Sequence, residues 1–164
     1  MPGTLDAPVF REAMSRLAAG VTIVAARDEA GHCWGFTATS VTSASLEPPL
    51  LVVGIARGSS CCPVFRTVRE FTVNILKEGH QHLARRFATS GIDRFAEGGF
   101  TEWRGGGPPC LDDAHVSLRC AALDAIPVGD HELLVGRVVD ARFPHPEDAP
   151  LLWYRRAFGS VTDD

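Results

Sequence analysis

The chain has 164 residues, a length that suits one domain with a core of its own. Hydrophobic residues make up 45% and charged residues 22%, which gives enough apolar material for a core and enough charge for solubility. The net charge of −4, with both signs interspersed, argues against a nucleic-acid-binding protein, which would need a basic face.

The sequence also argues against a membrane or secreted protein. No apolar run approaches the ~20 residues that cross a bilayer, and residues 1–8 lack the basic start and apolar stretch of a signal peptide. The five cysteines, an odd number with no Cys-x-x-Cys pair, are typical of reduced intracellular thiols. We therefore expect a cytoplasmic protein.

The first part of the chain predicts one helix and three strands. Apolar residues recur at helical spacing after a candidate N-cap at Asp6 and predict a helix over 7–18. Runs of β-branched and other apolar residues then predict strands over 21–26, 33–41 and 50–56. A polar turn joins the first two strands into a hairpin.

The rest of the chain predicts a helical turn at 63–70, a strand at 71–76, a helix at 81–89, a glycine-rich loop at 90–109 and long strands at 116–126 and 132–143. The apolar tail at 151–161 either covers its own barrel or contacts a partner subunit. Because the strands come in runs and most connections are too short for helical crossovers, we expect a mainly β fold with few short helices. An antiparallel barrel in a single domain, 1–164, fits this pattern.

Several common catalytic motifs are missing from the sequence. No Gly-x-Gly-x-x-Gly opens a helix, because the glycines at 105–107 run into Pro108. There is neither a phosphate-binding Gly-Lys-Ser/Thr loop nor a Gly-x-Ser-x-Gly elbow. His80 and His82 are two residues apart and would point in different directions on a helix, so we expect no metal site.

The segment 35–45 is rich in hydroxyl side chains and carries no charge. Side chains alternate along a strand, so Thr37, Thr39 and Val41 would share one face. Small residues and hydroxyl groups of this kind suit a planar heteroaromatic ring with carbonyl and N–H edges. An ordinary threonine-rich strand followed by a turn accounts for the same pattern.

Two further stretches carry candidate chemistry. Residues 54–60 run from a buried strand into a loop with one arginine and two serines before a helix, an arrangement that binds phosphate readily. A capped helix with a surface arginine explains it equally well. Gly129, Asp130 and His131 lie between the two long strands, where they form either a functional site or a solvent-exposed turn.

Taken together and in this order, these stretches resemble the flavin reductase family, which has the FMN-binding split β-barrel fold of antiparallel Greek-key type. The resemblance covers nearly the whole chain and is carried by Phe10–Met14, Ala19–Val24, Gly35–Pro49, Phe71–Leu76, Leu83–Ala88, Gly129–His131 and Pro150–Tyr154. It implies NADH- or NADPH-dependent reduction of free flavin, FMN or FAD, by hydride transfer. It also implies a homodimer and a partner flavin-dependent monooxygenase that receives the reduced flavin.

The resemblance implies a flavin site along the hydroxyl-rich segment and the loop that follows the next strand. The edge of the isoalloxazine ring would lie along residues 37–40, the ring and ribityl chain would meet residues 43–45, and the phosphate would approach residues 56–60. The implied flavin contacts are Thr37, Ala38, Thr39, Ser40, Ser43, Ala44, Ser45, Ala56, Arg57, Ser59, Ser60 and Phe87.

The family also implies roles for two residues beside the nicotinamide. His131 would lie over the site where the nicotinamide stacks, as the catalytic residue, and Tyr154 would close that side. Two departures from the family pattern affect the flavin contacts. Thr39-Ser40 stands where the family often has Asn-Ser, and Cys61-Cys62 matches no family pattern.

Two other functions remain open from the sequence. One is a split-barrel flavoprotein that retains FMN and acts as a different oxidoreductase. The other is a non-catalytic protein that binds flavin.

Overall fold

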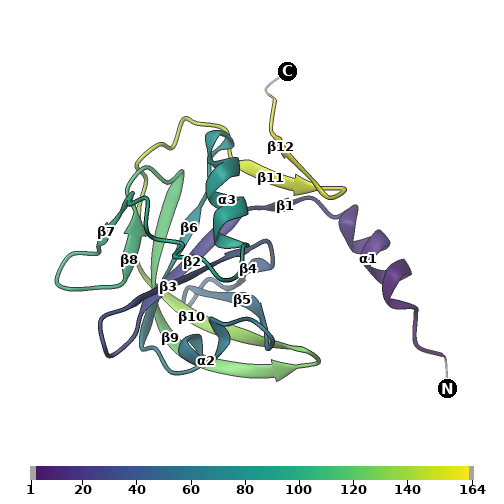
Figure 1. Cartoon of the computed structure of the whole chain (residues 1–164), viewed down its shortest axis with the longest axis horizontal. Helices are drawn as coiled ribbons and strands as arrows, with labels where there is room; N and C mark the ends of the chain where they lie inside the picture. The colour runs from purple at the N-terminus through teal and green to yellow at the C-terminus, as the bar shows by residue number, and fades with distance from the viewer. Residues whose placement is uncertain (1–2, 163–164) are drawn as a thin grey trace.

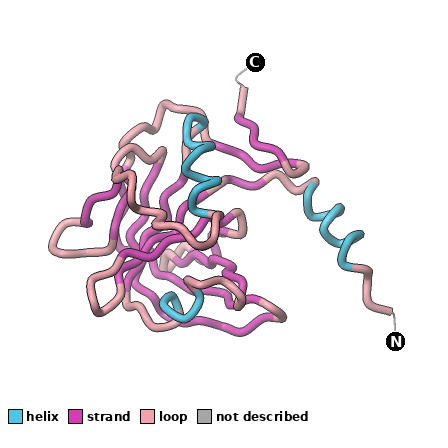
Figure 2. The backbone as a smooth tube through the Cα atoms, in the orientation of Figure 1, coloured by secondary structure: helices cyan, strands magenta, loops and turns pink. Residues whose placement is uncertain are grey.

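The computed structural model describes residues 3–162, which form a mostly β structure with short helices (Figures 1 and 2). The ends of the predicted domain, residues 1–2 and 163–164, lie outside the described residues. The helical elements are α1 (Ala7–Ser15), α2 (Cys62–Phe65), the 3-10 turn η1 (Glu78–His80) and α3 (Gln81–Phe87). The strands are β1 (Ala19–Gly20), β2 (Thr22–Arg27), β3 (Cys33–Ala38), β4 (Val41–Ser45), β5 (Leu50–Ala56), β6 (Glu70–Ile75), β7 (Phe100–Glu102), β8 (Pro109–Leu111), β9 (Val116–Val128), β10 (His131–Arg142), β11 (Leu151–Tyr154) and β12 (Ala157–Ser160).

One antiparallel sheet of seven strands dominates the fold, in the order β3-β2-β6-β9-β10-β5-β4. Its two edge strands, β3 and β4, are separated in the chain only by Thr39 and Ser40. The sheet therefore curls until its edges meet at this link, where the Gly54 N–H donates to the Ser40 carbonyl at 2.9 Å. Within residues 3–162 no strand pairing joins β3 to β4, so the barrel stays open along this line. The predicted mainly β, antiparallel fold is confirmed.

The inside of the curled sheet holds the larger apolar cluster. Phe36 and Phe65 meet edge to face with ring centroids 5.0 Å apart, so the short helix α2 closes one end of the cluster. Phe71 and Val73 of β6 and Val53 of β5 are buried beside them. Edge-to-face aromatic pairs of this kind add about 0.5–1.5 kcal/mol beyond their buried area.

A second apolar cluster lies on the outer face of the same sheet, beneath α3. Ile23, Leu76, Phe87 and Leu111 form its centre, and all are at most 1% exposed. Strand β2 contributes to both clusters and is buried on both faces. This explains why Ile23–Ala26 are apolar without interruption instead of alternating with polar residues.

The two ends of the described chain differ in how they pack against the main sheet. Helix α1 projects away from the sheet, and none of its residues is buried (Figure 1). The tail forms the β11–β12 hairpin, which pairs with β1 in a three-stranded sheet. Trp153 and Phe158 pack against the outer cluster, so the apolar tail covers its own chain. No helix within residues 3–162 has the length and apolar character needed to cross a bilayer.

The structure differs from the sequence-based elements at several boundaries. The strand predicted over 33–41 breaks after Ala38, because residues 39–40 carry the chain from one sheet edge to the other. The helix predicted over 7–18 ends at Ser15, since Ala19 already pairs with Trp153. The helical turn predicted at 63–70 spans only Cys62–Phe65, and the 90–109 loop contributes the short strand β7 and the start of β8.

Candidate functional site

Strand pairing brings the three candidate stretches to one place. Val41 pairs with Val53 across β4 and β5, which places the hydroxyl-rich segment beside residue 54. His131 pairs with Ala56 across β10 and β5, which places the Gly-Asp-His turn beside the loop that begins at residue 57. The backbone N–H of Arg57 donates to the Asp130 carbonyl at 3.0 Å and holds the loop and the turn together.

A cleft of about 370 Å³ opens where these stretches meet, along the link between β3 and β4. Its walls consist mainly of small side chains and exposed backbone. The predicted site residues that line it are Thr37, Ala38, Thr39, Ser40, Ala56, Ser59, Ser60, Phe87 and His131. Gly54, from the candidate stretch 54–60, and Ala88 line it too. Ser90 and Arg94 also line it, and the sequence reasoning did not single them out.

Some hydroxyl groups of the cleft already have partners in the protein. Thr37 Oγ1 donates to the Ala84 carbonyl at 2.6 Å, so this residue ties β3 to α3 and presents only lone pairs to a ligand. Ser59 Oγ accepts from the Cys61 N–H at 3.2 Å and keeps its own proton for a ligand. Thr39 and Ser60 are exposed at the cleft surface.

His131 lines the cleft, and its ring is held by Asp130. The Nδ1 atom is 2.7 Å from Asp130 Oδ1, so we assign the Nδ1 proton to this hydrogen bond and leave Nε2 free. The hydrogen bond from His131 lowers the pKa of Asp130. The carboxylate therefore stays ionised over the neutral range and orients the imidazole.

Five predicted site residues do not line this cleft. Ser43, Ala44 and Ser45 continue along β4, beyond the link. Arg57 turns towards Glu132, with 3.4 Å between its Nε and Glu132 Oε1. Tyr154 ends β11 with 46% of its surface exposed. Contacts between these residues and a flavin stay a prediction.

Arg94 is the cation on the cleft wall that sequence reasoning missed. Its Nη1 donates to the Gly35 carbonyl at 2.7 Å and its Nε donates to the Thr89 carbonyl at 3.0 Å. The residue lies in the glycine-rich loop 90–109, where no periodic pattern predicts the direction of a side chain. Only the fold reveals that this loop passes beside β3.

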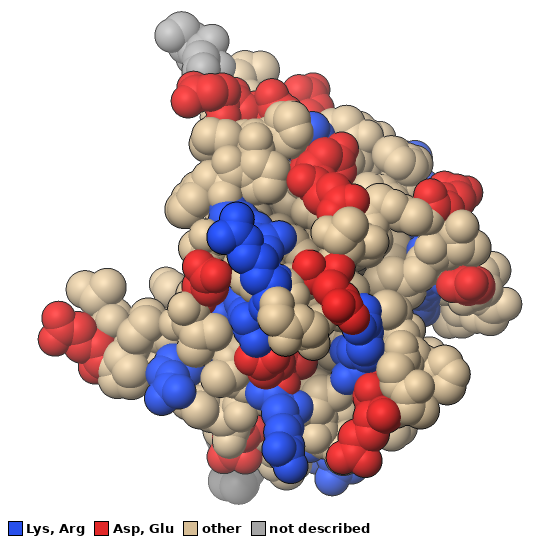
Figure 3. All heavy atoms as spheres, turned by 90° about the vertical axis from the view of Figure 1, so that its left-hand side faces the viewer, with Lys and Arg blue, Asp and Glu red and all other residues tan. Residues whose placement is uncertain are grey.

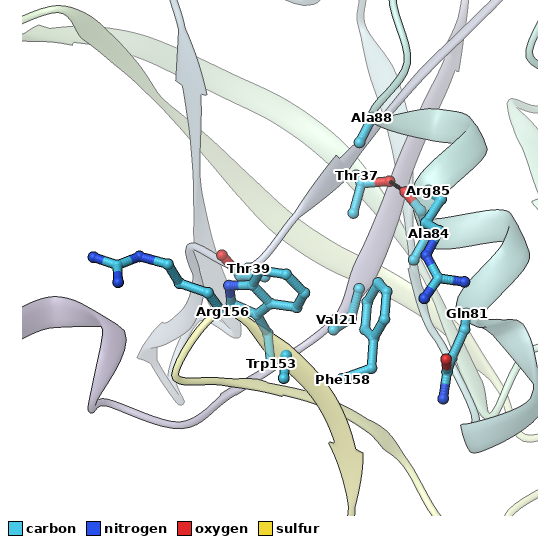
Figure 4. Close-up of a pocket in the computed structure, with 11 residues that line it drawn as sticks. Val21, Thr37, Thr39, Gln81, Ala84, Arg85, Ala88, Trp153, Arg156 and Phe158 are labelled. Carbon is cyan, nitrogen blue, oxygen red and sulfur yellow. Dashed lines mark hydrogen bonds between the residues drawn. The ribbon is translucent and has the colours of Figure 1, made fainter. Parts of the chain in front are cut away.

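Two larger hollows adjoin the cleft, and Thr39 lines all three spaces. One has a volume of about 610 Å³ and lies between α3 and the β11–β12 hairpin (Figure 4). Figure 4 shows Arg85 and Gln81 on the side of α3, with Trp153 and Phe158 opposite. The other, of about 790 Å³, lies between α1 and the β4–β5 edge.

The combined space suits planar rings bound by backbone and hydroxyl groups. Each volume falls in the range of small-molecule sites, roughly 300–1,000 Å³. A Cβ atom on Gly54 would lie 3.0 Å from Ser40 Oγ, so a larger residue would push into the cleft wall. The residues present therefore fit a flavin ring and leave room for a second ring beside it.

The charged side chains of the described residues neither cluster as metal ligands nor gather by sign on the face that Figure 3 shows. No cluster of three or more His, Cys, Asp or Glu side chains in the described part of the chain has the geometry of a metal site. Figure 3 shows one face, on which basic and acidic side chains alternate.

Comparisons with known proteins identify the family of this chain. The family model for the flavin reductase like domain matches residues 14–162. The NADH:riboflavin 5'-phosphate oxidoreductase of Streptomyces pristinaespiralis is 50% identical over 93% of this chain and 87% of its own length. The Streptomyces globisporus NADH:FAD oxidoreductase, solved in complex with NAD and FAD fragments, is 26% identical, with a TM-score of 0.89 over 99% of each chain. The styrene monooxygenase flavin reductase of Pseudomonas putida S12 is 27% identical, with a TM-score of 0.84 over 94% of this chain and 98% of its own. The chain belongs to the flavin reductase like domain family.

Proposed function

We propose that this protein reduces free flavin, FMN or FAD, with NADH or NADPH, and that the whole chain acts as one domain in doing so. The observation that carries the proposal is the cleft at the Thr39–Ser40 link, where the segment 37–40, Ala56 and His131 meet. The names of the similar proteins, which include NADH, riboflavin 5'-phosphate and FAD, support the same pair of substrates.

The reactive chemistry is hydride transfer from nicotinamide C4 to flavin N5, which the two bound molecules supply themselves. The protein has to hold two rings at reacting distance and keep water out. The small residues of the link let a ring approach the backbone of β3, and His131 stands at the open side with Nε2 free. No general acid or base is required, which is consistent with a site that contains no catalytic triad within residues 3–162.

The reduced thiols support a cytoplasmic location, where NADH and NADPH are available. All five cysteines are free: Cys33, Cys61, Cys62, Cys110 and Cys120. Burial raises the pKa of the Cys120 thiol to about 12, so this residue is an unreactive core side chain.

A homodimer is the second part of the proposal. Phe10 and Met14 share one face of α1 by their spacing, Leu17 follows the end of the helix, and the three side chains are 47–66% exposed. They line the hollow above β4 and β5 together with Val41 and Val52. A nine-residue helix is marginal in water without tertiary packing. A second copy of the chain, packed against this hollow, would cover the helix and narrow the site.

The proposal includes a partner enzyme that consumes the reduced flavin. The similar structure from Pseudomonas putida is named as the flavin reductase of styrene monooxygenase. By this likeness we propose a flavin-dependent monooxygenase as the partner. An open cleft of about 370 Å³, with exposed residues at its mouth, supports release of the product to another protein.

Consumption of NADH by the purified protein tests the activity. We expect absorbance to fall in air when FMN or FAD is added, and to stay constant when flavin is left out. A protein that oxidises no NADH with any flavin would leave only a binding role. A preparation that remains yellow after desalting would favour the alternative in which FMN is retained.

A further inference from the structure

We infer that Arg94 makes the cleft select flavins that carry a 5′-phosphate over riboflavin, an inference that rests on the proposed flavin site. Arg94 lies on the cleft wall with the serine loop, because Ser59, Ser60 and Arg94 all line the same space. Its side chain is half-buried, so its charge is less screened than that of a surface arginine.

The contacts of Arg94 leave its charge uncompensated. Its hydrogen-bond partners are the carbonyls of Gly35 and Thr89, and Nη1 also lies 3.4 Å from Cys61 Sγ. These partners fix the direction of the guanidinium, but none of them is an anion. No carboxylate oxygen of an Asp or Glu in residues 3–162 lies within 4.0 Å of the Arg94 guanidinium nitrogens. A guanidinium has five N–H donors. Nε and Nη1 already donate to these partners, so the two N–H groups of Nη2 remain for a ligand.

The neighbouring arginines already lie beside carboxylates of the protein. Arg57 and Arg66 both point at the buried carboxylate of Glu132, with nitrogen–oxygen distances of 3.4 and 3.8 Å. Arg86 pairs with Glu97. Arg57, the cation that the sequence assigns to the phosphate, is thus held away from the cleft by Glu132. Arg94 takes that place.

A phosphate is the ligand that matches this arrangement. Arginine binds phosphate oxygens with parallel N–H bonds, and charge-assisted bonds of this kind are about twice as strong as neutral ones. The Ser59 hydroxyl keeps a proton to donate, and Ser60 is exposed beside it. Arg94 together with these serines forms a site for a dianionic group at one end of the cleft.

Titration of FMN and riboflavin against the wild type, Arg94→Gln and Arg69→Gln tests this role. Flavin fluorescence reports binding, and NADH is left out, so the result does not depend on catalysis. We expect Arg94→Gln to weaken FMN binding by at least about tenfold, the loss of one charge-assisted contact, and to change riboflavin binding less than twofold. Arg69 is exposed and lies away from the cleft, so Arg69→Gln makes the same charge change and should leave both affinities as they are.

Comparing FMN with riboflavin distinguishes a phosphate contact of Arg94 from a purely structural role, because only FMN carries the phosphate. If Arg94 only anchors its loop to the Gly35 carbonyl, both affinities will fall together in Arg94→Gln, and the inference is overturned. It is also overturned if neither affinity changes. Arg94→Lys keeps the charge and should retain most of the FMN preference, which provides a second variant if Arg94→Gln does not fold. A wild-type protein that binds FMN but oxidises no NADH would contradict the proposed activity alone, whereas one that binds neither flavin would contradict both.

Discussion

The Nδ1 atom of His131 lies 2.7 Å from Oδ1 of Asp130, and this hydrogen bond orients an imidazole ring that lines the cleft. The same Asp130 accepts the Arg57 N–H through its backbone carbonyl at 3.0 Å. One residue therefore fixes both the ring and the adjacent loop. His131 is exposed and lines the cleft, and we propose that a second ring binds beside it.

We expect His131→Ala to impair use of the nicotinamide more than binding of flavin. Loss of one hydrogen bond of about 1 kcal/mol predicts a KM for NADH that rises roughly 5- to 10-fold. Steady-state kinetics at saturating flavin measures this change, and fluorescence titration measures flavin affinity. If flavin affinity alone collapses, the placement of His131 beside the nicotinamide is wrong.

The buried His80 predicts a loss of stability in mild acid. Burial lowers the pKa of His80, although the hydrogen bond and charge of Asp113 oppose the shift, while Lys77 and His82 add to it. Its Nδ1 accepts the Lys77 N–H at 3.2 Å, which requires the neutral ring. Because the folded pKa lies below the unfolded value of about 6.5, the stabilisation is present above that pH and is lost as pH falls through the folded pKa.

Thermal unfolding at pH 7.5 and pH 5.5, values on either side of about 6.5, checks this effect. We expect the midpoint to fall at the lower pH in the wild type and to fall less in His80→Gln. The exposed His82 serves as the control, so His82→Gln should keep the wild-type pH dependence. Titration of Asp113 does not contribute between these two pH values. Burial would raise the pKa of Asp113, but the hydrogen bond and charge of His80, together with Lys77, lower it, so it titrates in stronger acid.

Asn74 holds the centre of the fold through four hydrogen bonds. Its amide donates to the Ile23 carbonyl and the Thr72 hydroxyl, both at 3.0 Å. Its carbonyl accepts the Leu111 N–H at 3.0 Å and the Ser117 hydroxyl at 2.8 Å. Because Asn74→Ala leaves several buried groups unpaired, we expect it to lower the free energy of unfolding by about 2–4 kcal/mol. Denaturant melts should show a smaller loss for Ser117→Ala, and equal effects would contradict the network.

Gly136 allows Phe71 to pack against β10. A Cβ atom at residue 136 would lie 2.6 Å from the ring of Phe71 and 3.0 Å from the Cβ of Cys120. Phe71 is 1% exposed and cannot move aside, so we expect Gly136→Ala to destabilise the protein by about 1–3 kcal/mol. Gly159→Ala is the matched control, because a Cβ there meets nothing within 4 Å. Similar melting curves for the two variants would show that the strand relaxes.

The exposed apolar face of α1 predicts the oligomeric state. We expect sedimentation analysis to find a dimer for the wild type and a larger monomer fraction for the double variant Phe10→Ser, Met14→Ser. Phe143 is 62% exposed and lies outside α1, so Phe143→Ser should leave the dimer intact. A wild-type monomer at all concentrations would contradict the proposed dimer.

The sequence predicted the strands well where hydrophobic patterns were long. The strand over 50–56 matches β5, and the long strands over 116–126 and 132–143 match β9 and β10 to within a few residues. The break after Ala38 was not predictable, since residues 33–41 are compatible with a continuous strand. Only the curling of the whole sheet forces the chain to change edges at Thr39 and Ser40.

The sequence predicted the part of the candidate site that is formed by the segment 37–40 and by the strands next to it. The segment 37–40 and the residues Ala56 and His131 meet because β5 pairs with both β4 and β10. Arg57 and Arg94 show the limit of the approach. The family resemblance placed Arg57 near the flavin phosphate, but its side chain lies beside the buried Glu132 and does not line the cleft. No local pattern indicated that Arg94, in a glycine-rich loop, reaches the Gly35 carbonyl.

The most direct test of the flavin site is a titration of FMN against a variant in which the cleft is filled. Ala56 is exposed on the cleft wall, and Ala141 is exposed on β10 outside it. We expect Ala56→Trp to weaken FMN binding by more than about tenfold, since the indole occupies space that the ring needs. Ala141→Trp should bind FMN as the wild type does. Wild-type affinity in Ala56→Trp would show that flavin binds elsewhere and would contradict the placement of the site at the Thr39–Ser40 link.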